Sequence, residues 1–379
     1  MFYENQSEEQ KNQYKNMLSI IGKLSRLFSD NDAPYLPYRI QENIFCKYFN
    51  AVNISRSDCS ADAKKDNIGI GLKTWVGNDD QKVAEFNRLR NTFSNLSGLE
   101  LVQQIATLRN ERIRITKNLH SLTNMIYHIV KRIPGQMQIC EHSFDYIDIP
   151  NIRLINQRTT SNNIYFTDNH HTYHFSLSKN TLYMIFENLE ILDVFGVDIL
   201  DDPYSCLSLV ENNLQLITDP IETDNLERIC LRLYSSNRRD EKYIPERSGL
   251  NLWNARGRRR QLDEIYIPFP AKDKRRNPNF FPPRDTSFNL RLPNNEIISA
   301  KICQDNDKSI MSNPNTILGK WLLRDVFELP EGTLITYEML ERFGIDSVII
   351  TKYDENNYSI DFSEIGTYEQ FYNTEENEN

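Results

Sequence analysis

The stretch DAKKDNIGIGLKTW, residues 62–75, is the part of the sequence from which we predict the fold of the N-terminal half. The Asp-Asn pair at 66–67 separates two short runs, and both residue types tolerate the positive φ angles of a two-residue hairpin turn. Counting outward from that turn places residue 62 opposite residue 71. Opposite residues, and residues two apart on one strand, point to the same face. Asp62, Gly71 and Lys73 are therefore predicted to share one face of a hairpin.

The same stretch also invites comparison with a phosphate-binding loop, because it combines glycines, a lysine and a threonine. A Walker A loop requires G-x-x-x-x-G-K-[ST], with the lysine directly after the second glycine. Gly69 and Gly71 are separated by one residue, and Leu72 stands before Lys73. The spacing excludes a phosphate-binding loop of this type, and the strand interpretation remains.

A carboxylate on one strand and a lysine on the next suit a metal-dependent phosphodiesterase. The carboxylate helps to hold Mg²⁺, the metal lowers the pKa of a bound water, and the lysine stabilises the charge that develops on phosphate. Residues 62–75 resemble the core of the PD-(D/E)XK nuclease family, and Leu-Lys-Thr at 72–74 resembles its mismatch-repair branch. The resemblance implies a mixed sheet flanked by helices, Mg²⁺ as cofactor, and catalytic roles for Asp62 and Lys73.

The sequence departs from this family at Gly71, where the second acid is expected. Some restriction enzymes of the family take that acid from a neighbouring helix, which would reach into the gap that a glycine leaves. Glu85 in QKVAEFN and Glu42 in RIQENIF are the two candidates. We favour Glu85 as the second metal ligand, because its expected helix directly follows the lysine strand. Asp58, four residues before Asp62, is an alternative first acid.

Charge is distributed unevenly along the chain. The net charge is −9, which by itself argues against a polyanionic partner. From Arg238 to Arg291, however, 14 Lys and Arg stand against 7 Asp and Glu, so this segment carries +7 and the remainder −16. Local charge, not the total, determines where a polyanion binds. Residues 238–291 therefore form the predicted nucleic-acid-binding region.

The chain from about 245 to 364 resembles the C-terminal recognition domain of BfiI- and NgoFVII-type restriction endonucleases, a pseudobarrel shared with plant B-three transcription-factor domains. The shared stretches are SGLNLWNARGR, EIYIPFP, FNLRLPNNEIISAKICQ, LGKWLLRDVF and YSIDFS, in the order of the family. The resemblance implies two arms that grip the major groove of duplex DNA. The first arm corresponds to 247–260, and NDKSIMSNPN at 306–315 lies near the place of the second.

The chemistry of this segment agrees with the resemblance. Arginines contact phosphates, and a guanidinium reads guanine through two parallel hydrogen bonds. Neighbouring asparagines and a tryptophan add donors, acceptors and an apolar surface. The predicted DNA-binding residues are Arg247, Asn251, Trp253, Asn254, Arg256, Arg258, Arg259, Arg260, Lys272, Lys274, Arg275 and Arg276.

Hydrophobic periodicity and turn residues predict the organisation of the rest of the chain. Helices are expected over 8–29, 35–51, 81–93, much of 98–132 and 179–189, with a hairpin over 163–178. Short strand-like runs follow residue 243 and indicate a small barrel or sandwich. We predict a nuclease domain over 1–237, a B-three-like domain over 238–370 and an acidic disordered tail over 371–379.

Other features place the protein in a compartment and exclude some sites. The N-terminus lacks an apolar signal region, and no apolar run reaches about 18 residues. The six cysteines include no C-x-x-C pair, which favours reduced thiols. These features, with the Asn- and Ile-rich composition, predict a bacterial cytoplasmic protein. The HHTYH segment at 170–174 is interpreted as a hairpin tip with exposed imidazoles, because no Cys or acid completes a metal site.

Together these features predict a type II restriction endonuclease, with an α/β mixed-sheet domain and an all-β-rich pseudobarrel. Its expected partners are double-stranded DNA, a second copy of the chain, because one nuclease domain cuts one strand, and a cognate DNA methyltransferase. A non-catalytic sequence-specific DNA-binding protein and a strand-nicking repair endonuclease are the alternatives.

Overall fold

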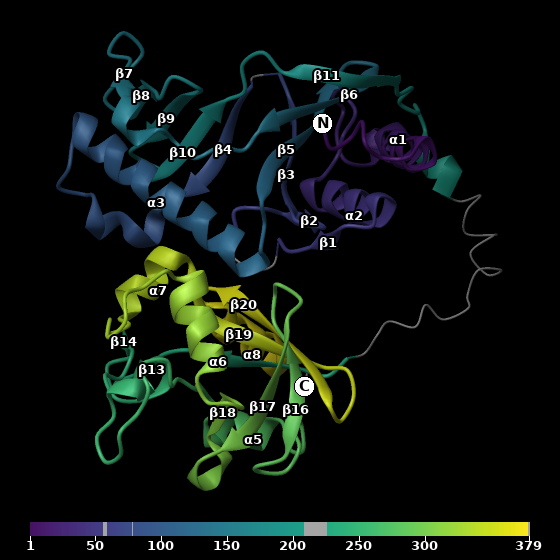
Figure 1. The fold of residues 1–379 in the computed structure, drawn as a ribbon. Helices are drawn as coiled ribbons and strands as arrows, with labels where there is room; N and C mark the ends of the chain where they lie inside the picture. The colour runs from purple at the N-terminus through teal and green to yellow at the C-terminus, as the bar shows by residue number, and fades with distance from the viewer. Residues whose placement is uncertain (56–58, 78, 208–225, 378–379) are drawn as a thin grey trace. The chain divides into compact units, whose positions relative to one another are not determined.

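The computed structural model of the protein describes residues 1–55, 59–77, 79–207 and 226–377. The chain forms two compact units, which are described separately below (Figure 1). The N-terminal unit contains most of the described residues up to 207. The C-terminal unit contains 226–377 and also Cys59 and 114–121. Every helix in the described part of the chain is too short or too polar to span a membrane.

A six-stranded mixed sheet lies at the centre of the N-terminal unit. Its strands, in spatial order, are β1 (Val52–Asn53), β2 (Ala63–Lys65), β3 (Ile68–Val76), β5 (Asn124–Ile133), β6 (Gln136–Ser143) and β11 (Glu190–Gly196). Strands β3 and β5 run parallel, and the other neighbours are antiparallel. The predicted hairpin is confirmed, because Lys65 pairs with Ile68 and Asp66 adopts a φ of 53°.

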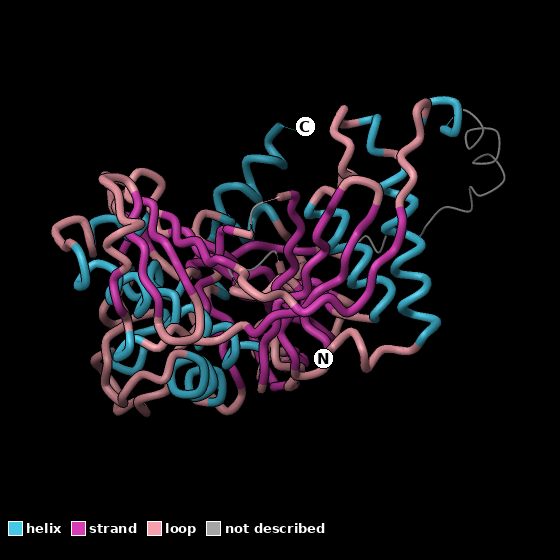
Figure 2. Tube along the Cα trace, turned by 90° about the horizontal axis from the view of Figure 1, so that it is seen from above, coloured by secondary structure: helices cyan, strands magenta, loops and turns pink. Residues whose placement is uncertain are grey.

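Two helices cover one face of this sheet, α1 (Glu8–Lys23) and α2 (Tyr38–Phe49) (Figures 1 and 2). Tyr14 and Phe45 from these helices share a core with Ile70 and Leu72 of β3. Because side chains alternate along a strand, Gly71 and Lys73 point to the face opposite that of Ile70 and Leu72. Lys73 therefore lies on the face away from α1 and α2.

A second, antiparallel sheet belongs to the same unit. Its strands, in spatial order, are β4 (Asp80–Glu85), β10 (Thr181–Ile185), β9 (Thr172–Ser176), β8 (Asn163–Thr167) and β7 (Arg153–Leu154). The long helix α3 (Gly98–His120) connects the region after β4 to β5, and its last turns, from Arg114 on, group with the C-terminal unit. The hairpin predicted over 163–178 is confirmed by the pairing of β8 with β9.

Two predicted helices are wrong. Residues 81–93 form β4 and a short 3₁₀-helix (Asn87–Thr92), and the segment 179–189 contains β10. Both segments extend because β4 and β10 pair with each other, from Glu85 opposite Thr181 to Asp80 opposite Ile185. Pairing between distant segments outweighs local helix propensity here.

The C-terminal unit is built on a seven-stranded sheet. Its strands, in spatial order, are β12 (Arg228–Arg232), β19 (Ile345–Lys352), β20 (Asn357–Glu364), β16 (Ser287–Arg291), β17 (Ile297–Cys303), β18 (Ser309–Ser312) and β15 (Ile267–Pro268). The two end strands, β12 and β15, contact each other, so the sheet is nearly closed into a barrel. A separate two-stranded ribbon joins β13 (Ser235–Ser236) and β14 (Lys242–Tyr243). Five of the predicted strand-like runs are confirmed as β15, β16, β17, β19 and β20.

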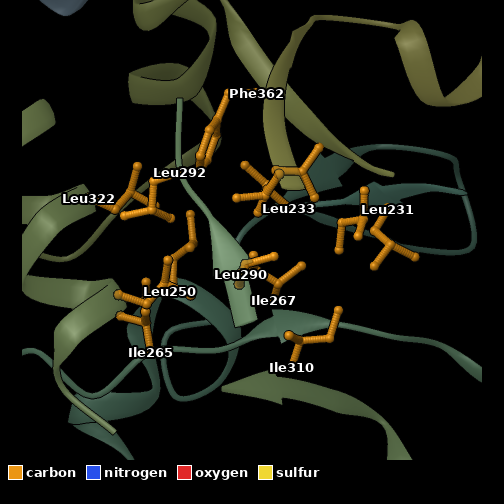
Figure 3. Close-up of a cluster of buried hydrophobic side chains, with 14 of the residues drawn as sticks. Leu231, Leu233, Leu250, Ile265, Ile267, Leu290, Leu292, Ile310, Leu322 and Phe362 are labelled. Atoms are coloured by element: carbon orange, nitrogen blue, oxygen red, sulfur yellow. The ribbon is translucent and has the colours of Figure 1, made fainter. Parts of the chain in front are cut away.

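The interior of this barrel is filled by aliphatic and aromatic side chains (Figure 3). Leu231 on β12, Leu290 on β16 and Ile310 on β18 are fully buried in this cluster. The surrounding helices are α5 (Ala271–Arg276), α6 (Ile317–Gly319) with the π-helix Lys320–Val326, α7 (Tyr337–Phe343) and α8 (Thr367–Asn377). Such a continuous apolar interior stabilises the barrel chiefly through the hydrophobic effect.

Both ends of the C-terminal unit differ from the predicted boundaries. Strand β12 precedes the predicted start at 238 and supplies part of the barrel core. Residues 371–377 of the predicted tail continue helix α8. Tyr368 and Tyr372 of α8 are buried, and their hydroxyls donate to Asp273 and to the carbonyl of Cys230. Two tyrosines one helical turn apart therefore fix this helix, although its composition is acidic.

Candidate active site and nucleic-acid interface

The hairpin holds Asp62 against the adjacent strand. Oδ2 of Asp62 accepts a hydrogen bond from the backbone amide of Leu72 at 2.7 Å. Ala63, the next residue, belongs to the core under α1 and α2, so the Asp62 side chain starts from the other side of its strand. Strand β2 ends its pairing at Ile70, and Asp62 therefore satisfies an edge amide that no strand covers.

Asp62 and Lys73 influence each other's protonation. Burial raises the pKa of Asp62, while the charge of Lys73 and the Leu72 amide act to lower it. Burial lowers the pKa of Lys73, while the charge of Asp62 acts to raise it. The Lys73 amino group also donates to the carbonyl of Lys82 in β4, at 3.0 Å. The acid and the lysine predicted from the hairpin thus influence each other electrostatically.

Glu42 on α2 joins this environment. Its side chain is buried, and it accepts hydrogen bonds from Arg39 at 3.0 Å and from Ser55 at 3.1 Å. Burial, followed by the negative charge of Asp62, raises the pKa of Glu42. Two like charges affect each other in this way when they are close. The structure therefore brings Glu42 together with Asp62 and Lys73.

The residue before Glu42 also contacts the lysine strand. Nε2 of Gln41 donates to the carbonyl oxygen of Lys73 at 2.9 Å. Its Oε1 is buried and accepts no hydrogen bond from the described residues. A buried oxygen of this kind costs free energy unless it gains a partner. Helix α2 thus brings a carboxylate and an unsatisfied amide oxygen to the same strand edge.

Glu85 stands on a strand of the second, antiparallel sheet. It is the last residue of β4, not part of a helix, and its side chain is 44% exposed. Its carboxylate accepts from Lys82 at 2.7 Å and from Asn87. The hydrogen bond from Lys82 is the main cause that lowers the pKa of Glu85. Glu85 is therefore exposed and already bound by Lys82 and Asn87.

The expected gap at Gly71 is filled. A Cβ atom at this position would lie 2.8 Å from the ring of Tyr127 and 3.0 Å from that of Phe144. Tyr127 stands on β5 directly beside Gly71, and its ring stacks on Phe144 with centroids 4.1 Å apart. An aromatic pair thus occupies the place in which the family's second acid was expected. Glycine at this position makes room for Tyr127, and the prediction of an open space beside the metal is wrong.

We expect Gly71→Ala to destabilise the N-terminal unit by about 1–3 kcal/mol, the usual cost of overpacking a filled core. Gly196→Ala is the matched control, because its new Cβ would meet only one atom, 4.0 Å away, and its backbone needs no positive φ. Urea unfolding followed by circular dichroism measures both changes. Equal midpoints for the two variants would contradict the close packing at Gly71.

Arg109 on α3 was not predicted from the sequence, although its charge acts on Lys73. Its side chain is 3% exposed and donates to the carbonyl of Asp145 at 2.8 Å and to the hydroxyl of Tyr127 at 3.4 Å. Its charge acts to lower the pKa of Lys73. Arg109, Gln41 and Tyr127 come from three separate segments, so no local pattern could have identified them.

The remaining metal-site predictions have less support in the structure. Asp58, the alternative acid, lies outside the described residues. Among the residues that are described, no group of three His, Cys, Asp or Glu side chains is arranged to hold a metal ion. In the HHTYH segment, His170 is exposed as predicted, but His174 is buried and stacks on Tyr183 with centroids 4.6 Å apart. The prediction of exposed imidazoles therefore holds for His170 and is wrong for His174.

The predicted DNA-binding residues fall into two groups. The first group is exposed, and within the described chain none of its side chains has a hydrogen bond or an ion pair. These residues are Arg247, Arg256, Arg259, Lys272 and Arg275. Exposed, unpaired cations are available to phosphates without losing an internal partner.

The second group is engaged within the protein. Asn251 is buried and bonds to the backbone of Pro245 and Ile335, so its predicted contact with DNA is replaced by a structural role. The other engaged or partly buried residues are Trp253, Asn254, Arg258, Arg260, Lys274 and Arg276.

The comparisons with known proteins concern the C-terminal unit. The chain matches no curated protein sequence significantly. Residues 226–354, however, match the family model of the NgoFVII C-terminal B3-like DNA-binding domain. The matched region begins just before β12 and covers the barrel as far as the end of β19. The C-terminal unit is therefore similar to the B3-like DNA-binding domains of restriction enzymes, and this similarity supports double-stranded DNA as a partner.

Proposed function

We propose that the protein is a type II restriction endonuclease that hydrolyses double-stranded DNA with Mg²⁺ as cofactor. The observation that carries this proposal is the NgoFVII-type DNA-binding domain, joined to a unit in which Asp62, Lys73 and Glu42 share one site. The mixed sheet of that unit, flanked by helices, agrees with the fold that the PD-(D/E)XK resemblance implies.

The side chains present fit a magnesium ion. In such sites Mg²⁺ takes one or two carboxylates and completes its shell with waters and substrate phosphates. Asp62 and Glu42 are the carboxylates that would hold it, and the buried Oε1 of Gln41 has no hydrogen-bond partner among the described residues. The metal supplies a bound water of lowered pKa as the nucleophile.

Lys73 performs the second part of the chemistry. Its ammonium group would stabilise the negative charge that develops on the scissile phosphate, and a preorganised cation in a partly buried site is effective for this. The charge of Asp62 supports the protonated form of Lys73, against the opposing effects of burial and of Lys82 and Arg109. Burial is the larger effect and lowers the pKa of Lys73, while Asp62 and Glu42 act to raise it, so the lysine stands beside two acids that favour its charged form.

A non-catalytic, sequence-specific DNA-binding protein is the second candidate. It is favoured by the lack of a three-ligand group among the described residues. The two functions differ in one experiment. The purified full-length chain is incubated with plasmid and phage DNA, with Mg²⁺ or with EDTA, and the ends are sequenced. Restriction requires Mg²⁺-dependent ends at one recurrent sequence. Binding without new ends supports the second candidate, and breaks in one strand only indicate a nicking enzyme.

Two partners belong to the same proposal. Cleavage of both strands needs two nuclease sites, and we expect a homodimer at least while DNA is bound. A cognate DNA methyltransferase would protect the host genome from the enzyme. Sedimentation with and without duplex DNA tests the first expectation, and the genes adjacent to this one test the second.

We expect Arg256→Ala and Arg259→Ala each to weaken DNA binding by about 3- to 10-fold. The slope of log affinity against log salt concentration should become shallower by about one unit. The reason is the loss of one phosphate contact and its released counterion. Fluorescence anisotropy at several salt concentrations measures both effects. Arg158→Ala, an exposed arginine of the N-terminal unit, is the control. Unchanged slopes in both variants would remove these arginines from the interface.

A further inference from the structure

One carboxylate organises the arginine-rich loop, residues 256–261. Glu264 is only 5% exposed, although it carries a charge. It accepts from both terminal nitrogens of Arg258, at 2.6 and 3.3 Å, and from Arg260 at 3.2 Å. It also accepts from the backbone amide of Gln261 at 3.1 Å. A buried charge is tolerated when it is paired and fully hydrogen-bonded, and this one holds two guanidinium groups at once.

The segment that carries Glu264 is itself fixed to the barrel. The amide of Glu264 donates to the carbonyl of Gln261 at 3.1 Å and closes a turn. Asp263 accepts from Arg324 at 2.7 Å, and Arg324 also donates to the carbonyls of Leu329 and Pro330. The backbone of Asp263 lies so near Gly319 that a Cβ there would be 1.9 Å from the Asp263 oxygen. Glu264 therefore connects a rigid base to the arginines of the loop.

This arrangement divides the four arginines of the loop into two classes. Arg256 and Arg259 are exposed, and within the described chain their side chains have no partner. Arg258 and Arg260 are oriented by Glu264, although Arg258 remains 55% exposed. Free arginines contact phosphates in any sequence, whereas reading a base edge requires a donor in a fixed place. An orientation set before binding also avoids the entropy cost of ordering a long side chain.

We propose that Glu264 is a positioning residue for sequence recognition, which orients Arg258 and Arg260 toward base edges and withholds them from unspecific phosphate binding. The inference rests on the proposed function of the C-terminal unit in sequence-specific DNA binding. It assigns sequence specificity to Arg258 and Arg260, which Glu264 binds, and general affinity for DNA to the exposed Arg256 and Arg259. A merely structural role for Glu264 would instead make specific and unspecific binding fall together.

The test uses the full-length protein without Mg²⁺, so that DNA is bound but not cut. Glu264→Gln is compared with the wild type and with Glu246→Gln, which removes the same charge from an exposed side chain nearby. One probe is a pool of duplexes with a randomised centre, sequenced after selection. The other is a single duplex of fixed, mixed sequence, titrated at several salt concentrations.

We expect the wild type and Glu246→Gln to enrich one common motif. Glu264→Gln should bind the fixed duplex about 3- to 10-fold more tightly, with a slope steeper by about one to two units, because two released arginines gain phosphates. Its enrichment of the motif should fall at least about 10-fold. Arg258→Ala, which keeps Glu264, should lose enrichment without the steeper slope.

Several outcomes would overturn the inference. Enrichment of the same motif to the same degree by Glu264→Gln or by Arg258→Ala removes the positioning role while sequence-specific binding stands. A parallel loss of both kinds of binding by Glu264→Gln assigns it a structural role instead. If the wild type enriches no motif, the proposed function of the C-terminal unit fails, and the inference fails with it.

Discussion

Lys73→Ala and Asp62→Ala are expected to reduce the cleavage of plasmid DNA by at least about 100- to 1000-fold, the usual effect of removing one preorganised charge at a reacting group. Asp62 is one of two carboxylates available to a metal. The charge of Lys73 lowers the pKa of Asp62 more than that of Arg39 does. Because the two residues act together, the double variant should cut DNA no more slowly than the less active of the two single variants. Cleavage time courses with excess enzyme measure the chemical step directly.

Binding supplies the control for this result. We expect the C-terminal unit to bind DNA without these two residues, so both variants should retain the affinity of the wild type for duplex DNA within about 2- to 3-fold. Lys65→Ala is the matched variant, because Lys65 lies on the same hairpin and, among the described residues, donates only to the carbonyl of Asn50. It should cut DNA normally. Full activity of Asp62→Ala would transfer its role to Asp58 or end the nuclease interpretation.

The parts of the fold that could be predicted from the sequence depend on neighbouring residues. The turn at 66–67 fixes the register of the first hairpin, and Asp66 takes the positive φ that its residue type tolerates. In the barrel, short runs of β-branched and aromatic residues between turn residues became strands for the same local reason. The relation of Asp62 to Lys73 followed from this local register alone.

The parts that failed depend on distant pairing. Residues 81–85 became a strand because β10, far along the chain, provides its partner. Gly71 looked like a gap because nothing in the sequence near it indicates that Tyr127 would lie beside it on a parallel strand. A parallel pair is connected through α3, so its register is not set by a turn and cannot be counted from the sequence.

The corrected positions change which acid we expect to complete the site. Glu85 is exposed and satisfied by Lys82 and Asn87, whereas Glu42 is buried and its pKa is raised by burial and by Asp62. A carboxylate whose charge is disfavoured by a neighbouring acid gains most when a divalent cation enters between them. Glu42 therefore has the stronger electrostatic reason to bind the metal.

We accordingly expect Glu42→Gln to lower cleavage at 1 to 10 mM Mg²⁺, on the order of typical assay concentrations, by about 100-fold or to require far more metal for the same rate. Glu85→Gln, which removes the same charge with the same volume change, should leave the metal dependence within about 2-fold of the wild type. The measurement is the initial cleavage rate across a Mg²⁺ titration for both variants.

Because glutamine still accepts the hydrogen bonds from Arg39 and Ser55, Glu42→Gln should unfold at the same urea concentration as the wild type. A loss of activity with unchanged stability and a shifted metal requirement therefore identifies Glu42 as a ligand. The reverse pattern, with Glu85→Gln impaired and Glu42→Gln unaffected, would return the role of second acid to Glu85, at the end of β4.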